Sequence, residues 1–382
     1  MEVMSAMRPR VILDAGPAVH QAAGLGRYAT ELAAALWRGE SNRTDLTLFY
    51  NDHSGHRLPA ALADVPSSRL PMGQYRWRLS ALASQVVHRP NLQRRLPPGD
   101  VYHATEHLLP RMARRTVLTV HDLIFRQLPE THTLRNRAFL TTAMPIFARR
   151  ADAIIAVSEQ TRRDVVTAYG VPEAKVEVIP EGIDQDLFQP VCTGCDLSQT
   201  LRQRHGDYLL MVGTLEPRKN HATAARALAI LNQRGRSLNL VVVGGSGWKF
   251  SPFHQLVEEL NLGPQVHFAG RVPDAELPAY YSNARVLLQP SLYEGFGFPI
   301  LEAMACATPV VSSNRSSLPE LAGDCALLID PTEPDAIANA VEQVLDQPRL
   351  RSEMIRGGRK RAATFTWAAA ARRTADLYLS LL

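Results

Sequence analysis

Two carboxylates flank a glycine-containing stretch in the C-terminal half of the chain. Glu294 opens the sequence EGFGFP, and Glu302 follows in the adjoining segment ILEAMA. Gly295 and Gly297 allow a sharp bend and a close approach of the backbone to a ligand. The N–H groups at the start of a helix lack partners and attract anions. The stretch therefore predicts an anion site between two hydroxyl-accepting carboxylates, which is what a nucleotide sugar requires. A strand–turn–helix corner with two solvated glutamates is the alternative.

Two cations form the second candidate group. Arg218 and Lys219 lie in the sequence GTLEPRKN, which begins at Gly213 and Thr214 directly after an apolar run. Arginine can bind a phosphate through two nitrogen atoms, and lysine adds a point charge. On this motif alone, a solvated helix cap is an equally good interpretation.

The N-terminal half contributes weaker candidates. Gly24 and Gly26 belong to a predicted loop, GLGR, between the strand 11–15 and a helix from Tyr28 to Trp37. A G-x-G without a third glycine matches many turns. His121 ends the apolar run 116–120, where a histidine is more often structural than catalytic. The loop Gly244–Gly247 lacks the spacing of a dinucleotide-binding fingerprint, which argues against a dehydrogenase.

Alternating strands and helices position these residues. Short apolar runs are expected as strands at 11–15, 46–50, 101–103, 116–120, 153–157 and 176–179, and again at 208–212, 240–243, 266–268, 286–289, 310–312 and 326–328. Strands that alternate with helices predict parallel sheets covered on both faces. Ligands of such sheets bind beyond the carboxyl ends of the strands, where the candidate residues lie. The predicted class is α/β with two Rossmann-like doubly wound sheets.

Length supports two domains. The chain has 382 residues, and single cores stop growing at ~250–300 residues. We expect an N-terminal Rossmann-like domain over 1–189, a linker over 190–206, a C-terminal Rossmann-like domain over 207–362, and a final helix over 363–382 that crosses back to the first domain. The linker contains a lone C-x-x-C, Cys192 and Cys195, without the second ligand pair of a zinc site.

Charge is distributed unevenly. The formal net charge is +5, yet the window from Arg69 to Arg150 holds 14 arginines and 4 acidic residues, a balance of 14 − 4 = +10. Aromatic and apolar residues alternate with these arginines, a mixture that suits an anionic membrane surface or an anionic acceptor. A solvated arginine-rich face is the alternative. Nucleic-acid binding is disfavoured because no corresponding motif accompanies the charge.

Taken together, these motifs resemble the retaining glycosyltransferases of family four, which have the two-domain GT-B fold. The resemblance runs in order along nearly the whole chain, through VHDLIF, VSEQTRRDV, VIPEGID, VGTLEPRKN, EGFGFPILEAMACATPVV, LPELAGDCALLIDP and FTW. The paired-glutamate stretch is its most specific part. The combination of motifs resembles bacterial mannosyltransferases that build O-antigen or exopolysaccharide repeats. The resemblance implies two domains that face a cleft, the first binding the acceptor and the second the nucleotide sugar.

Site roles follow from the resemblance. It implies catalytic roles for His121, Glu294 and Lys219. Glu302 would accept hydrogen bonds from the ribose of the donor, and Arg218 with Lys219 would neutralise the diphosphate, so that no metal or other cofactor is needed. The remaining donor-binding residues would be Gly24, Gly26, Gly213, Thr214, Arg271, Val272, Gly295, Phe296, Gly297 and Phe298. Many relatives carry an arginine where this chain has Thr214, which increases the dependence on Arg218 and Lys219.

The expected activity is transfer of a hexose, most simply mannose from GDP-mannose, to a glycan or lipid-linked saccharide. Alternatives are a UDP-sugar-dependent transferase or synthase of the same fold, and a non-catalytic glycan-binding protein. The last predicts loss of Glu294, Lys219 or Glu302, all of which are present. The chain has no apolar run of the ~18–20 residues that span a bilayer and no recognisable signal peptide. We therefore expect a cytoplasmic protein that can contact the inner face of the membrane peripherally through the region 69–150.

Overall fold

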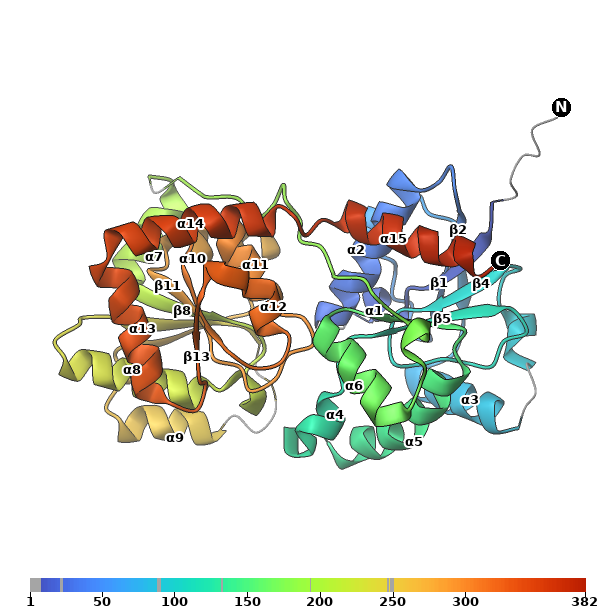
Figure 1. Cartoon of the computed structure of the whole chain (residues 1–382), viewed down its shortest axis with the longest axis horizontal. Coiled ribbons are helices and arrows are strands. Elements are labelled where there is room, and N and C mark those ends of the chain that lie inside the picture. Colours follow the sequence, from blue (N-terminus) through green and yellow to red (C-terminus); the bar gives the residue numbers. More distant parts are fainter. Residues whose placement is uncertain are drawn as a thin grey trace. The chain divides into compact units, whose positions relative to one another are not determined.

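The computed structural model describes residues 8–20, 23–87, 91–131, 133–192, 194–245, 247 and 251–382. Its chain divides into two compact units (Figure 1). Unit 1 comprises Met1–Arg126, His132–Gly182 and Trp367–Leu382, and unit 2 comprises Gln127–Thr131 and Ile183–Thr366. Each unit is built on one parallel sheet, which confirms the predicted α/β class.

Unit 1 contains a seven-stranded parallel sheet in the order β3-β2-β1-β4-β5-β6-β7. The strands are β1 (Arg10–Asp14), β2 (Asp45–Asn51), β3 (Ser67–Leu70), β4 (Val101–Ala104), β5 (Arg115–Val120), β6 (Ala153–Ala156) and β7 (Val176–Val178). The helices are α1 (Gly16–Val19), α2 (Ala23–Gly39), α3 (Gln74–Val86), α4 (Ile124–Gln127), α5 (Leu134–Arg150), α6 (Glu159–Tyr169) and α15 (Trp367–Ser380), with short 3-10 turns η1 (Ala60–Leu62), η2 (Asn91–Arg95), η3 (Pro129–Thr131) and η4 (Glu173–Lys175).

Alternate residues of these strands bury opposite faces. One face carries Ile12, Tyr102 and Leu118 and packs against Trp77 of α3 and Phe147 of α5. The other face meets α2 and α15, where His103 Nδ1 lies 2.6 Å from the hydroxyl of Tyr378. A sheet buried on both faces explains why its central strands read as continuous apolar runs.

The last helix belongs to unit 1, although it follows unit 2 in the sequence. Helix α15 packs along α2 (Figure 1). Arg43, which follows α2, bonds Asp376 of α15 at 2.5 Å. Among the described residues, no helix is long and apolar enough to cross a membrane.

Unit 2 contains a six-stranded parallel sheet in the order β10-β9-β8-β11-β12-β13. The strands are β8 (Tyr208–Val212), β9 (Asn239–Val243), β10 (Val266–Gly270), β11 (Val286–Gln289), β12 (Val310–Ser313) and β13 (Leu327–Ile329). The helices are α7 (Asp196–His205), α8 (His221–Gln233), α9 (Ser251–Glu259), α10 (Leu277–Asn283), α11 (Phe298–Ala305), α12 (Leu318–Ala322), α13 (Pro334–Asp346) and α14 (Pro348–Ala362), with 3-10 turns η5 (Pro217–Lys219), η6 (Asp274–Glu276) and η7 (Gly323–Cys325). Helices α8, α9 and α13 cover one face of the sheet, and α10 and α11 lie on the opposite side (Figure 1).

Two local expectations were wrong. The segment GLGR does not form a loop, because helix α2 already begins at Ala23. Glycine lowers helix stability by about 1 kcal/mol but permits helical backbone, and burial of Gly26 and Tyr28 favours the longer helix. Strand β3 had no counterpart in the expected strands, because its sequence SSRL is mostly polar. It lies at the edge of the sheet, where burial does not demand an apolar run.

The contact-based division of the chain falls close to the boundaries expected from the sequence. Unit 1 ends its first part at Gly182, and α15 begins at Trp367. The range 190–206, expected as a linker, contains helix α7, which packs against α10 within unit 2. Cys195 caps α7, and its thiol lies 3.2 Å from the Ser198 hydroxyl.

Candidate active site

The strand order of unit 2 reverses between β8 and β11, and the candidate residues follow these two strands. In doubly wound sheets, such a reversal opens a crevice at the carboxyl ends of the strands. Residues 213–220 leave β8 and residues 290–297 leave β11. The two loops are joined directly, because the backbone N–H of Leu292 donates to the carbonyl oxygen of Arg218 at 2.8 Å. The motifs predicted separately therefore form one cluster.

Glu294 is the centre of this cluster. Its side chain is 7% exposed, and its Oε1 lies 2.6 Å from Nζ of Lys219. Its Oε2 pairs with the guanidinium of Arg218. Two further donors reach Oε1, namely the Ser291 hydroxyl at 2.8 Å and the Gln289 amide at 3.0 Å. Four side chains from two loops thus hold one buried carboxylate in place.

A second carboxylate joins from the same loop as the cations. Glu216 Oε1 lies 2.5 Å from Nη2 of Arg218, so the guanidinium bridges two glutamates. Arg218 also donates to the carbonyl oxygen of Tyr293 at 3.2 Å. Arg218 is therefore a structural bridge in this conformation, in addition to being a candidate phosphate ligand.

Electrostatics keep Glu294 ionised. Burial alone would raise the pKa of Glu294, but the adjacent Arg218 and Lys219 outweigh burial and lower the pKa to about 2. Burial lowers the pKa of Lys219, and the carboxylate of Glu294 partly restores it. Buried ions of opposite sign and close contact stabilise each other's charged form. The cluster is a preformed arrangement of charge in a site with little water.

Glycines allow the loops to adopt this arrangement. Gly213 has a φ of +139°, and a Cβ there would meet Cε of Lys219 at 3.2 Å. Gly297 has a φ of +125°, and a Cβ there would lie 2.7 Å from a methyl group of Leu318. Both positions combine a left-handed backbone with a close neighbour, which only glycine tolerates without strain.

The loop before α11 is fastened from the far side by two serines. Ser317 donates from its hydroxyl to the carbonyl oxygens of Glu294 and Phe296, at 2.9 and 2.6 Å. Ser316 accepts the backbone N–H of Glu294 at 2.9 Å. Gly295 and Phe296 are buried, and the Phe296 ring contacts that of Phe298 edge-on. These contacts fix the backbone through Gly297 into the first turn of α11.

Glu302 lies on α11 and is 2% exposed. The hydroxyl of Tyr281, on α10, donates to Oε2 of Glu302 at 2.6 Å. A buried carboxylate on the helix that follows the glycine loop is suited to accept hydrogen bonds from hydroxyl groups. The ribose-binding role of Glu302 stays a prediction.

The other predicted donor residues of unit 2 lie at the same edge of the sheet but are not joined to the cluster. Thr214 follows Gly213, and the methyl group of Thr214 lies against the backbone position of Gly247. Arg271 and Val272 follow β10, the edge strand, and the exposed side chain of Arg271 has no hydrogen bond or ion pair with any described residue. The predicted contact of Arg271 and Val272 with the base stays untested.

His121 occupies the corresponding edge of unit 1, directly after β5. Its ring is buried, with Nδ1 2.9 Å from Glu181 Oε1 and Nε2 2.9 Å from the carbonyl oxygen of Thr105. Because both partners are acceptors, both ring nitrogens carry protons in this arrangement. Burial lowers the pKa of His121, but the hydrogen bond and charge of Glu181 outweigh burial and raise it. His121 is therefore held between two acceptors within unit 1, an arrangement that favours its protonated form.

Gly24 and Gly26 lie in the first turns of α2, near the same ends of β1 and β5. The carbonyl oxygen of Gly26 accepts the hydroxyl of Thr30 at 2.8 Å. Two residues later in the helix, the Tyr28 ring stands edge-on to the ring of His121 at 4.7 Å. The helix thus supports His121, while contact of these glycines with a donor phosphate stays a prediction.

The sequence did not predict three residues that hold the candidate site residues in place: Glu181, Glu216 and Tyr281. Glu181 belongs to the sequence VIPEGID, which was used only for the resemblance. Glu216 lies inside the quoted motif GTLEPRKN, between residues that were assigned roles. Tyr281 carries no sequence signal, since an aromatic residue in a helix is usually core. Sequence motifs identify the residues that touch ligands more readily than the residues that hold those ligand-binding side chains in place.

Comparison with known proteins gives independent evidence for the family and the fold of the chain. Residues 22–187 match the model of the family described as "Glycosyltransferase Family 4", and residues 198–361 match "Glycosyl transferases group 1". The chain is 29% identical over 378 residues to O-antigen chain mannosyltransferase B of Escherichia coli, covering 97% of this chain and 99% of that protein. It is 31% identical over 281 residues to a GDP-mannose-dependent alpha-(1-6)-phosphatidylinositol monomannoside mannosyltransferase of Mycolicibacterium smegmatis, covering 69% of this chain and 70% of that protein.

Solved structures share the fold. Sucrose-phosphate synthase from Thermosynechococcus elongatus superposes with a TM-score of 0.78 at 22% identity, covering 98% of this chain and 99% of the other. The Anabaena protein HepE, solved with UDP-glucose, superposes with a TM-score of 0.74 at 20% identity, covering 98% and 100%. With both halves matched by family models and both sheets shared with these structures, the chain belongs to family 4 of the glycosyltransferases and is a hexosyltransferase of the GT-B fold.

Proposed function

We propose that this chain is a retaining mannosyltransferase that uses GDP-mannose and extends a glycan or lipid-linked saccharide. The observation that carries the proposal is the cluster of Glu294, Arg218 and Lys219 at the strand reversal of unit 2. It supplies positive charge for a diphosphate leaving group and a carboxylate for sugar hydroxyls. The similarity to mannosyltransferases, one of them named as GDP-mannose-dependent, supports mannose and GDP.

In the proposed reaction, the bond between the sugar C1 and the phosphate oxygen breaks while the acceptor oxygen bonds to C1 on the same face. The acceptor proton passes to the departing phosphate oxygen, and GDP is released. Arg218 and Lys219 stabilise the negative charge that develops on the diphosphate. Such electrostatic stabilisation is usually the largest single contribution of a preorganised site to the rate. Glu294, kept ionised by these cations, supports the positive charge on the sugar ring.

Two cations at the leaving group also supply what a metal would contribute. We therefore propose transfer without a metal ion or other cofactor. A UDP-sugar donor is the main alternative, because no residue of the cluster distinguishes guanine from uracil. His121 is proposed as a further catalytic group, acting as the cation that Glu181 maintains.

A thermal-shift titration tests the donor. A ligand that binds the folded state stabilises it by RT ln(1 + [L]/Kd), which is about 2.7 kcal/mol at a ligand concentration of 100 Kd, and so raises the melting temperature. GDP-mannose and GDP should stabilise the chain more than UDP-glucose, UDP-N-acetylglucosamine and UDP. Radiolabelled mannose should then pass from GDP-mannose to a saccharide acceptor. Stabilisation and transfer by a UDP-sugar, with none by GDP-mannose, would refute the mannosyl donor while leaving glycosyl transfer intact.

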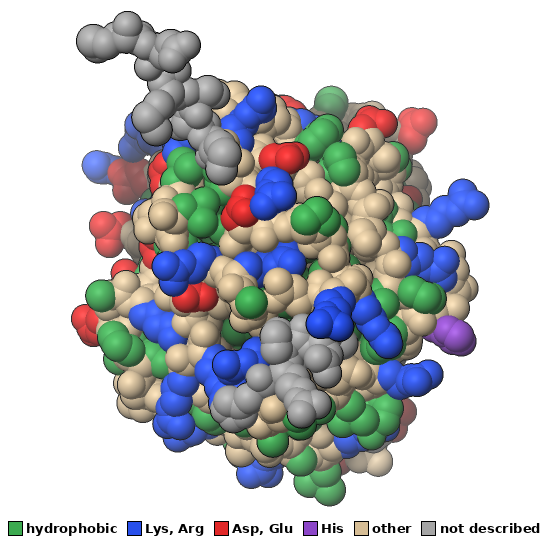
Figure 2. All heavy atoms as spheres, turned by 90° about the vertical axis from the view of Figure 1, so that its right-hand side faces the viewer, with side chains coloured by type: hydrophobic (Ala, Val, Ile, Leu, Met, Phe, Trp, Pro, Cys, Tyr) green, Lys and Arg blue, Asp and Glu red, His purple; other side chains and the backbone are tan. Residues whose placement is uncertain are grey.

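We further propose a cytoplasmic site of action, with peripheral contact to an anionic membrane through the region 69–150. Apolar side chains stand exposed on its helices, including Tyr75, Leu79 and Val86 on α3 and Leu134 on α5. The guanidinium of Arg135 stacks 4.1 Å above the Tyr75 ring. In Figure 2, Lys and Arg side chains are spread over one face of the molecule with hydrophobic ones between them. Binding to vesicles should rise with anionic lipid and fall with salt; indifference to both would oppose the proposal.

A further inference from the structure

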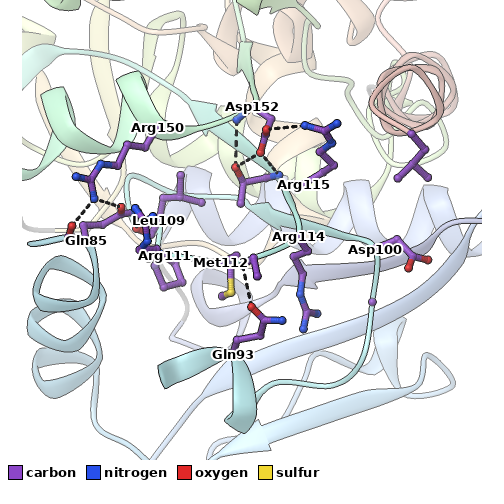
Figure 3. Close-up of a pocket in the computed structure, with 15 residues that line it drawn as sticks. Gln85, Gln93, Asp100, Leu109, Arg111, Met112, Arg114, Arg115, Arg150 and Asp152 are labelled. Atoms are coloured by element: carbon purple, nitrogen blue, oxygen red, sulfur yellow. Dashed lines mark hydrogen bonds and ion pairs between the residues drawn. The ribbon is translucent and has the colours of Figure 1, made fainter. Parts of the chain in front are cut away.

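A pocket of about 680 Å³ opens in unit 1 at the amino ends of β4 and β5 (Figure 3). His121 lies at the carboxyl end of β5, so the six-residue strand, roughly 17–20 Å long, separates the pocket from the candidate catalytic histidine. The pocket is also distinct from the donor cluster, which belongs to unit 2. Neither the resemblance nor the mechanism assigns it a role.

Charged side chains dominate its lining. Four arginines and two aspartates contribute, for a balance of 4 − 2 = +2; these are Arg111, Arg114, Arg115, Arg150, Asp100 and Asp152. In Figure 3, Arg111, Arg114 and Arg115 come from the segment that leads into β5, and Arg150 lies beside Gln85 at one end of the pocket. An excess of guanidinium groups around an open pocket favours an anionic occupant.

Both aspartates already have cationic or hydrogen-bonding partners. Asp100 accepts the Nε and Nη2 of Arg10 at 3.2 and 2.8 Å, together with the Arg10 backbone N–H. Asp152 pairs with Arg115 at 3.2 Å and accepts the N–H and hydroxyl of Thr116, each at 2.8 Å. Neither carboxylate bonds to Arg111 or Arg114.

Neither of these arginines therefore forms an ion pair with a described carboxylate, although the charge of Asp100 acts on Arg114 from beyond bonding distance. The side chain of Arg111 is half-buried and makes no hydrogen bond or ion pair there. Arg114 is held by one bond from Nη1 to the carbonyl oxygen of Pro97 at 2.9 Å, while its Nε is buried without a partner. A buried N–H with no acceptor is costly, and an occupant with oxygen atoms would remove that cost.

The amide of Gln93 completes the donor set. Its Oε1 accepts the backbone N–H of Ala113 at 2.8 Å, which leaves its NH₂ group to donate (Figure 3). Two guanidinium groups and an amide, of which Arg114 and Gln93 are each held by a backbone group, supply several donors for the oxygen atoms of a phosphate group. We propose that this pocket binds a phosphate group, free or as the headgroup of an anionic lipid, through Arg111 and Arg114.

Calorimetric titration of the full chain with inorganic phosphate, and separately with glycerol 3-phosphate, tests the site at constant ionic strength. The unaltered chain should show saturable binding. Arg111→Gln should weaken it at least about tenfold, as expected for loss of charge-assisted hydrogen bonds. This substitution breaks no hydrogen bond or ion pair of the side chain with a described residue, so the fold should persist. Arg38→Gln is the matched control, because Arg38 is exposed on α2, outside both the pocket and the region 69–150, and its side chain also makes no hydrogen bond or ion pair with a described residue.

Absence of saturable binding, or equal affinity in Arg111→Gln and Arg38→Gln, would overturn the proposal. Sedimentation with phosphatidylcholine vesicles, with and without phosphatidic acid, separates the two sources of phosphate. A lipid headgroup predicts that Arg111→Gln lowers binding to the acidic vesicles more than Arg38→Gln. A free phosphate predicts equal vesicle binding by both variants, with the phosphate titration impaired only in Arg111→Gln. Glycosyl transfer is measured with a different assay. Failure of the phosphate-binding proposal can therefore be distinguished from failure of the proposed transfer.

Discussion

Nζ of Lys219, in the loop after β8, lies 2.6 Å from Oε1 of Glu294, in the loop after β11. This pair connects the two strands at which the order of the sheet reverses, and it places a cation and a carboxylate in one buried spot. We propose that a diphosphate entering there competes with Glu294 for Lys219 and Arg218. The carboxylate of Glu294 would then be available to a sugar hydroxyl of the donor.

Lys219→Ala should reduce kcat/KM by about 10²–10³, because removal of one donor to developing negative charge costs roughly 2.7–4 kcal/mol. The folded state should persist, since Glu294 keeps Arg218, Ser291 and Gln289. Steady-state transfer assays measure the effect, and Lys360→Ala controls for loss of charge because Lys360 is exposed on α14. Equal kcat/KM in the two variants would rule out a role of Lys219 at the leaving group.

Glu302→Ala should abolish measurable transfer and weaken donor binding. Tyr281→Phe provides the matched comparison, since it removes the 2.6 Å hydrogen bond to Glu302 while retaining the carboxylate. If Glu302 accepts hydrogen bonds from the ribose hydroxyls, Tyr281→Phe should keep donor affinity within a few-fold. It should lower the free energy of unfolding by only about 0.5–1.5 kcal/mol, the contribution of one hydrogen bond. Thermal shifts with nucleoside diphosphate and with free nucleoside report both. Normal donor affinity in Glu302→Ala would contradict the assignment.

Glu181→Gln should lower the pKa of His121, because the carboxylate of Glu181 contributes most to raising it in the folded state. The sign of the pH dependence follows. Below the unfolded pKa of about 6.5, both states are protonated and the stabilisation from the pair is fully present. As pH rises through the raised folded pKa, the proton leaves and that stabilisation is lost. Histidine titration by NMR and denaturant unfolding across this range measure both quantities.

Glu181→Gln should make the unfolding free energy depend less on pH than it does with the His121–Glu181 pair. At low pH it should lower that free energy by about 1–3 kcal/mol, because a buried hydrogen-bond partner is weakened. Asp122→Asn is a useful comparison, because Asp122 contributes to the pKa of His121 only as a weaker, last-ranked charge. An unchanged His121 titration in Glu181→Gln would contradict the proposed coupling.

Gly297→Ala should destabilise unit 2 and impair the donor loop together. Its φ of +125° strains any residue with a side chain, and the new methyl group would lie 2.7 Å from Leu318. Strained backbone of this kind costs about 1–3 kcal/mol. Gly245→Ala is the control, since a Cβ at Gly245 meets no atom within 4 Å and its φ is not positive. Equal melting temperatures for both variants would show that the loop can relax without loss.

The sequence predicted the parts of the molecule whose cause is local. Apolar runs such as 208–212 and 286–289 became β8 and β11, because fully buried parallel strands need continuous apolar side chains. Arg218, Lys219 and Glu294 were each identified from residues next to such runs. Their mutual ion pairs could not be predicted, because pairing depends on which strands become neighbours in the sheet, and β8 and β11 lie far apart in the chain.

Residues that act through packing were also hidden from sequence reasoning. Polar β3 is a strand because β2 supplies its hydrogen bonds, and Gly24 and Gly26 are helical because the helix around them packs well. Glu181 lies close to His121 only through folding, since sixty positions separate the two. Tertiary contact overrides local propensity at each of these places.

Transfer should persist when divalent cations are removed, since Arg218 and Lys219 can neutralise the diphosphate without a metal. We expect the rate after treatment with EDTA to stay within about twofold of the untreated rate, well under the tenfold that 1.4 kcal/mol represents. Lys219→Ala makes the comparison sharper, because added Mg²⁺ bound to the diphosphate should recover part of its lost activity but leave the unaltered enzyme unchanged. If EDTA abolishes transfer by the unaltered enzyme and Mg²⁺ restores it, the two cations are insufficient, and the diphosphate leaves as a metal complex.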